Sequence, residues 1–215
     1  MPSIPLKEQY GPTLGQLLAP RWHASSPWVR TLLLAACVGI LAAAAGLALT
    51  LERASISYGG PVPFSFEYRN LYRTTAEPGG YVRVLRRKNG VLEESFAVGP
   101  LELPPYEGSL TGELPLYAAG YIRRLERRYR DFNLRGEGKT RVNTVPAYNI
   151  FYSALIGGRQ MYGRDVLLLP ERPGVRAGVD IVILTSPRAS SQVKSPLGVA
   201  GTGPLDTALH SFSFE

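Results

Sequence analysis

The side chains that most often carry catalysis are sparse in this chain. Its histidines are His23 and His210, and its single cysteine is Cys37. A serine hydrolase would have to use His210 with Ser211 and Asp206, but no nucleophile elbow or glycine-rich oxyanion turn accompanies them. We therefore expect His210 to be a surface or helix-capping histidine.

Signatures of metal, carboxylate and phosphate-loop chemistry are also missing from the sequence. No group of cysteines and histidines has the spacing of a zinc site. The acidic residues are scattered apart from Glu93-Glu94, whose side chains on a strand would point to opposite faces. Glycine pairs such as Gly157-Gly158 are not part of a GxxxxGK[ST] or GxGxxG motif. We predict no metal, no cofactor and no enzymatic activity.

One stretch has residues suited to binding. Between Tyr121 and Arg141 there are eight basic and three acidic residues. Such a run is usually a solvated helix face, but it can also dock on anionic lipid headgroups or an acidic protein partner, at about 1 kcal/mol per basic residue near a charged surface. Nucleic acid is not expected, because aromatic residues do not interleave with the basic ones. The candidate binding residues on one helix face are Arg123, Arg124, Arg127 and Arg130.

An apolar segment near the N-terminus positions the rest of the chain. Residues Thr31–Leu51 include no charged side chain. About 20 apolar residues in a helix span a bilayer core of roughly 30 Å, so we predict a single transmembrane helix. Its length and its distance from the N-terminus are typical of an uncleaved signal anchor rather than a cleaved signal peptide. Because Cys37 lies inside this segment, the remaining chain has no cysteine for a disulfide.

The residues around the anchor predict its orientation. Residues 1–30 form a proline-rich leader that includes Arg21 and Arg30, whereas Arg53 is nearly alone behind the anchor. Basic residues near a membrane span favour the cytoplasmic side. We therefore predict a single-pass protein of the cell membrane with a cytoplasmic leader and an extracytoplasmic C-terminal domain.

The remaining chain is predicted to be a linker (52–61) followed by one domain (62–215). Alternating apolar and polar residues at 62–69 predict a strand. Asn89-Gly90 between two extended runs predicts a tight hairpin. Apolar residues at i, i+3 and i+4 spacing predict a helix from Leu114 to Phe132.

Three strands and a short helix complete the predicted domain. The strands fall at 144–156, 163–171 and 178–186, with Pro170–Gly174 closing a hairpin between the last two, and the helix at 204–212. The continuous apolar runs Val166–Leu169 and Ile181–Leu184 are typical of strands covered on both faces, so we expect helices on both sides of the sheet. Hairpins rather than crossovers predict an α+β fold with a mainly antiparallel sheet.

The order of these segments has a counterpart in a known group of domains. An early FSFEY strand (64–68) is followed by a hairpin, a helix and the run PAYNIFYSALIGGRQMYGRDVLLL (146–169), and a short helix ends in SF. Over Val62–Phe214 this order resembles the Mog1/PsbP-like group, and within it the membrane-anchored or lipoprotein-type domains of actinobacteria. Members of this group bind partner proteins or have no known activity, so the resemblance implies a binding role at most and supplies no catalytic residues. The leader lacks a lipobox cysteine, so lipid anchoring is not indicated.

Two classes of function are compatible with these features. The favoured one is a membrane-tethered, non-enzymatic binding or accessory domain that recruits a protein or polar ligand at the cell envelope. The alternative is a hydrolase-like enzyme acting on the envelope. A deep polar cleft with convergent carboxylates, or His210 paired with a nucleophile, would favour the enzyme.

Overall fold

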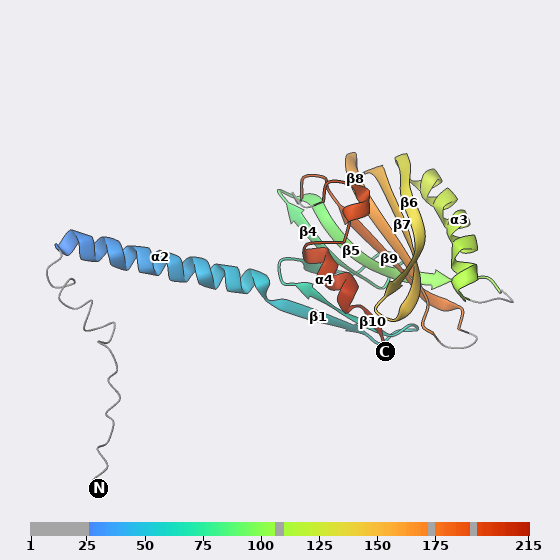
Figure 1. Ribbon diagram of the computed structural model, residues 1–215, viewed down its shortest axis with the longest axis horizontal. Coiled ribbons are helices and arrows are strands. Elements are labelled where there is room, and N and C mark those ends of the chain that lie inside the picture. The colour runs from blue at the N-terminus through green and yellow to red at the C-terminus, as the bar shows by residue number, and fades with distance from the viewer. Residues whose placement is uncertain (1–25, 106–109, 172–174, 190–192) are drawn as a thin grey trace, which may run out of the picture. The chain divides into compact units, whose positions relative to one another are not determined.

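The computed structural model describes residues 26–105, 110–171, 175–189 and 193–215 (Figure 1). The chain divides into two compact units, Met1–Leu49 and Thr50–Glu215. Most of the predicted leader lies outside the described residues.

The first unit includes one long apolar helix, α2 (Pro27–Leu51). It begins four residues before the predicted anchor, and the Thr31 hydroxyl donates to the Pro27 carbonyl in its first turn (3.0 Å). Over Pro27–Ala48 it is long and apolar enough to cross a membrane. Large side chains such as Leu32, Val38 and Leu41 are exposed along it.

The second unit is built from two antiparallel sheets. The small sheet has the order β1-β2-β10, and the large sheet has the order β3-β4-β5-β9-β8-β7-β6. The strands are β1 (Arg53–Tyr58), β2 (Phe64–Arg69), β3 (Arg73–Thr75), β4 (Val82–Lys88), β5 (Val91–Glu102), β6 (Arg130–Val142), β7 (Val145–Ile156), β8 (Arg159–Leu168), β9 (Ala177–Thr185) and β10 (Ser213–Phe214). The helices are α3 (Leu110–Arg128), the short η1 (Pro196–Gly198) and α4 (Pro204–Ser211). The predicted α+β class with an antiparallel sheet is confirmed.

The predicted linker at 52–61 is wrong, because most of it is strand β1. Every residue of β1 pairs with β2, from Arg53 opposite Arg69 to Tyr58 opposite Phe64. The rings of Tyr58 and Phe64 stack with their centroids 5.0 Å apart. The Gly59-Gly60-Pro61 segment is therefore the turn of a hairpin rather than a spacer.

The central strands of the large sheet are covered on both faces, as the continuous apolar runs predict. Val166, Ile181 and Ile183 belong to a core shared with the small sheet and α4. Leu167 and Leu184 belong to a second core under α3. The expectation of helices on both faces is only half correct, since a sheet and α4 together cover one of them. Figure 1 shows α3 and α4 on different sides of the large sheet.

Helix α3 ends earlier than the spacing predicts. It stops at Arg128, and the edge strand β6 begins at Arg130, with a register shift between Arg130 and Asn133 around Asp131, whose φ is 51°. Tyr129 and Phe132 still pack on the ring of Tyr152, with centroids 6.0 and 5.2 Å away. Tyr129 and Phe132 therefore continue the apolar spacing of the helix in the sequence, although both residues follow the end of α3.

Candidate functional site

The predicted basic face of α3 is exposed. Ala118, Ile122 and Leu125 are buried against the sheet. On the other side of the helix Arg123 and Arg127 are exposed, one helical turn apart. Neither of them forms an ion pair with a residue that the structure describes. These two arginines are the free part of the predicted site.

The other two predicted residues lie differently. The Arg124 guanidinium donates to the Tyr117 hydroxyl (2.9 Å) and lies 5.1 and 5.3 Å from the ring centroids of Tyr117 and Tyr121. A guanidinium over aromatic faces is held by cation–π attraction, so Arg124 is partly committed to its own helix. Arg130 is exposed but is not on the helix, because it is the first residue of β6 and pairs with Leu155. Its assignment to the helix face is wrong.

A buried polar cluster lies beneath α3, and no motif in the sequence indicated it. The Tyr121 hydroxyl is 2.8 Å from Asp165 Oδ2 and 2.5 Å from Asp180 Oδ2. The Tyr152 hydroxyl donates to Asp165 Oδ1 (3.0 Å). Asp165 comes from β8 and is fully buried, and Asp180 comes from β9. The signal in the sequence is an aspartate inside each of two apolar runs, RDVLLL and GVDIVIL.

The hydrogen bonds require one carboxyl of this cluster to be protonated. A tyrosine hydroxyl has a single hydrogen, so it cannot donate to two carboxylates. Burial, and then repulsion by Asp180, raises the pKa of Asp165 well above its usual value. Burial raises the pKa of Asp180 to about 6. Protonated Asp165 therefore donates to Tyr121, and Tyr121 donates to the Asp180 carboxylate.

This cluster fixes the helix rather than offering a reaction site. Burial and the two carboxyl groups raise the pKa of Tyr121 well above its usual value, so the hydroxyl keeps its hydrogen. A substrate would have to displace α3 to reach Asp165. Among the described residues no group of three or more His, Cys, Asp or Glu side chains is placed to hold a metal ion.

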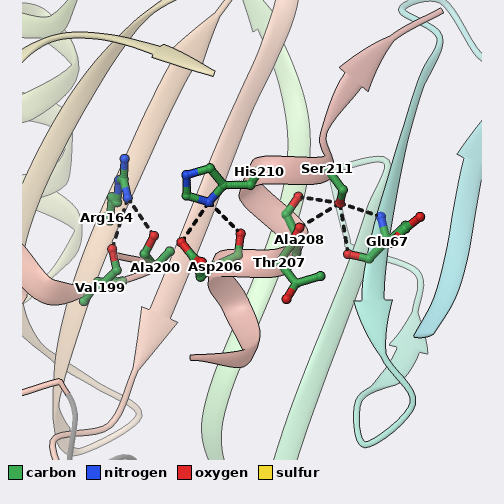
Figure 2. A network of polar contacts seen from close by, with 9 residues as sticks. All are labelled: Glu67, Arg164, Val199, Ala200, Asp206, Thr207, Ala208, His210 and Ser211. Atoms are coloured by element: carbon green, nitrogen blue, oxygen red, sulfur yellow. Dashed lines mark hydrogen bonds and ion pairs between the residues drawn. The ribbon is translucent and has the colours of Figure 1, made fainter. Parts of the chain in front are cut away.

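The residues considered for a serine-type triad do not form one (Figure 2). His210 Nδ1 lies 2.8 Å from Asp206 Oδ1, one turn away on α4. The Ser211 hydroxyl instead donates to the Thr207 carbonyl (2.7 Å) and accepts from the Glu67 amide (2.8 Å). Figure 2 shows the His210 ring and the Ser211 hydroxyl pointing to opposite sides. Ser211 therefore attaches α4 to β2.

Arg164, also drawn in Figure 2, has a structural role. Its Nη1 donates to the carbonyls of Val199 (3.2 Å) and Ala200 (3.1 Å), and its Nε donates to Asn149 Oδ1 (3.1 Å). Burial lowers the pKa of this guanidinium. Arg164 thus holds the loop before α4 against β8 and β7.

Comparison with known proteins identifies the fold. The sequence matches no protein-family model and no curated protein. Cyanobacterial PsbP (CyanoP) from Synechocystis sp. PCC 6803 is a similar solved structure, with 16% identity over 76% of this chain and 92% of that chain and a TM-score of 0.50. LpqN, involved in cell envelope biogenesis of Mycobacterium tuberculosis, has 8% identity over 76% and 91% of the two chains and a TM-score of 0.52. The two-sheet unit of this chain therefore has the Mog1/PsbP-like fold.

Proposed function

We propose that this protein is a membrane-tethered, non-enzymatic accessory domain of the cell envelope, and that the face of α3 with Arg123 and Arg127 docks on anionic lipid headgroups. The observation that carries the proposal is the exposure of these two arginines without an ion-pair partner among the described residues. The apolar side of the same helix is buried. The charges therefore face solvent on a rigid support.

The tether is α2, acting as an uncleaved signal anchor. Its exposed apolar surface is long enough to cross a bilayer. The basic residues Arg21 and Arg30 before the helix favour a cytoplasmic N-terminus and an extracytoplasmic domain. LpqN is involved in cell envelope biogenesis, and an envelope location for this chain is compatible with that likeness of fold.

Lipid is favoured over a protein partner because the tether already holds the domain at a membrane. Each arginine near an anionic surface contributes about 1 kcal/mol, which is weak for a domain that diffuses freely. A tethered domain meets headgroups at an effective concentration that is set by the length and stiffness of its tether. Weak contacts by Arg123 and Arg127 are then sufficient for docking.

The enzyme alternative has less support. The Ser211 hydroxyl is bound to β2 and turned away from His210. The paired carboxyl groups of Asp165 and Asp180 lie beneath α3. Neither arrangement presents a nucleophile or a general base to a substrate.

Vesicle sedimentation tests the proposal. The full chain in phosphatidylcholine nanodiscs should sediment with dense phosphatidylglycerol vesicles at low salt and not with phosphatidylcholine vesicles, and sedimentation should fade at physiological salt. The variant Arg123→Gln/Arg127→Gln should lose this association. The matched control Arg73→Gln/Lys194→Gln removes the same charge from exposed positions on β3 and on the segment before η1, and should retain it. Equal sedimentation of the two variants would exclude the α3 face, and no sedimentation of the wild type would exclude lipid as its target.

A further inference from the structure

A notch opens at one end of the large sheet, because β9 is shorter there than its neighbours. Its last residue, Thr185, pairs with Glu94 on β5 and with Tyr162 on β8. Residues 91–93 of β5 and 159–161 of β8 continue beyond that point. The gap between them is one strand wide, roughly 10 Å or twice the spacing of neighbouring strands.

The segment that follows β9 lines this gap, with Ser186 and Arg188. The Ser186 amide donates to the Glu93 carbonyl (2.7 Å), and the Ala189 amide donates to the Ser186 carbonyl (2.9 Å). Two hollows of about 230 and 200 Å³ meet there and share Arg159, Ser186 and Arg188. We call these two hollows the notch.

The notch is lined by cations from three separate segments. Lys88 comes from the end of β4, Arg159 from the start of β8 and Arg188 from the segment after β9. All three are exposed and form no ion pair with a described residue. The described lining has one acidic residue, Glu93, which lies 3.4 Å from Arg86, and Arg86 also pairs with Glu94 at 3.0 Å. The notch therefore carries an excess of positive charge.

Tight turns fix the backbone next to two of these cations. Lys88 is followed by Asn89 and Gly90 with φ values of 52° and 78°, and Arg159 follows Gly157 and Gly158 with φ values of 59° and 76°. Two-residue hairpin turns with positive φ match the twist of the strands and fix their register. The backbone positions of Lys88 and Arg159 are thus set before any ligand arrives, which lowers the entropic cost of binding.

We propose that the notch binds the phosphate group of a phosphate ester. Guanidinium groups pair with phosphate oxygens through parallel N–H···O bonds. A phosphate monoester has a charge of about −1.5 to −2 at neutral pH and three acceptor oxygens, which suits three cations. Gln160 and Asn89 in the same lining add neutral donors. This site is separate from the proposed docking face of α3 and does not depend on it.

Calorimetry with soluble probes tests the site. Glycerol 1-phosphate and inorganic phosphate are titrated into the full chain in zwitterionic detergent. We expect saturable binding, weakened by about tenfold for each arginine removed in Arg159→Gln/Arg188→Gln, since charge-assisted hydrogen bonds are the strong ones. The matched control is Arg73→Gln/Lys194→Gln, which loses the same charge from exposed positions outside both proposed sites and should bind as the wild type does. Lys88→Gln provides a second test from a different strand.

A lipid arm identifies the source of the phosphate. Full chain in phosphatidylcholine nanodiscs is sedimented with vesicles that contain phosphatidic acid at physiological salt, at which docking by the α3 face is expected to have faded. Loss of this binding in the Arg159/Arg188 variant and not in the Arg123/Arg127 variant, with no binding of soluble probes, would support a headgroup phosphate. Absence of both soluble and vesicle binding, or equal losses in the two double variants, would overturn the notch. Vesicle binding lost only in the Arg123/Arg127 variant would also overturn the notch and leave the proposed docking of α3 intact.

Discussion

The substitution Asp165→Asn should stabilise the domain at neutral pH, although it changes a fully buried polar residue. The Asn amide group can donate to Tyr121 as the protonated carboxyl does, and its carbonyl oxygen can accept from Tyr152. The substitution therefore keeps both hydrogen bonds at Asp165. At neutral pH the folded wild type must keep a proton on Asp165 that the unfolded chain releases. The Asn side chain of the variant does not titrate, so this cost is absent.

The size of the effect follows from proton linkage. The pKa of Asp165 in the folded state lies well above that of the unfolded chain, so the folded state binds the extra proton and stability falls as pH rises above about 4. The slope is about 1.4 kcal/mol per pH unit while only the unfolded residue is ionised. Asp180 adds a second fall between about pH 4 and its folded pKa of about 6, about 3 kcal/mol in total for a shift of two units. The variant should keep only the fall from Asp180.

Urea unfolding of the fragment Thr50–Glu215 at several pH values measures this difference. Both tryptophans of the protein, Trp22 and Trp28, lie outside that fragment, so far-UV circular dichroism is the suitable signal. Wild type and Asp165→Asn should have similar stability near pH 4 and diverge as the pH rises. Parallel curves from pH 5 to 8 would show that folded Asp165 is ionised and would refute the shared proton.

The control Tyr121→Phe removes the hydroxyl that joins the two carboxyl groups. It should destabilise the domain by about 2 kcal/mol, the cost of unpaired buried polar groups. It should also raise the pKa of Asp180 above about 6, because the hydrogen bond from Tyr121 lowers that pKa. The pH window in which stability falls should therefore extend upwards in this variant.

Three further predictions concern the core, the domain boundary and the topology. Ile183→Asp should unfold the domain, because an unpaired charge at a fully buried site costs several kcal/mol; an unchanged melting transition would show that β9 is not central. The fragment Thr50–Glu215 should fold cooperatively, whereas Gly59–Glu215, which lacks β1, should be less stable or aggregate through the exposed edge of β2; equal urea midpoints would show that β1 contributes nothing. Protease added to intact cells should digest the domain and spare the leader, and protection of the domain until lysis would reverse the proposed orientation.

Local chemistry made much of the fold predictable. Asn89-Gly90 forms a tight hairpin because both residues tolerate positive φ, a property of the dipeptide itself. The apolar runs at Val166–Leu169 and Ile181–Leu184 predicted strands buried on both faces, since no other placement hides every side chain. The stripe of α3 predicted its buried side for the same reason.

The errors arise where distant partners decide the structure. The sequence did not predict β1, because Gly59-Gly60-Pro61 has the composition of a linker. The residues before it, Arg53–Tyr58, form a strand only because they pair with β2. β6 was hidden because it is an edge strand with charged residues along it, and Arg130 was assigned to the preceding helix. The notch depends on the end of β9 relative to β5 and β8. No local pattern could have brought its three cations together.

The pairing of β10 with β2 has a consequence for the biogenesis of the chain. Ser65 and Ser213 are partners across 148 positions of sequence, so one edge of β2 cannot be completed until residue 214 has been synthesised. At about 5 to 20 residues per second this interval is on the order of ten seconds. During that time Phe64 and Phe66 belong to a strand with an open edge, which is a template for pairing with another chain.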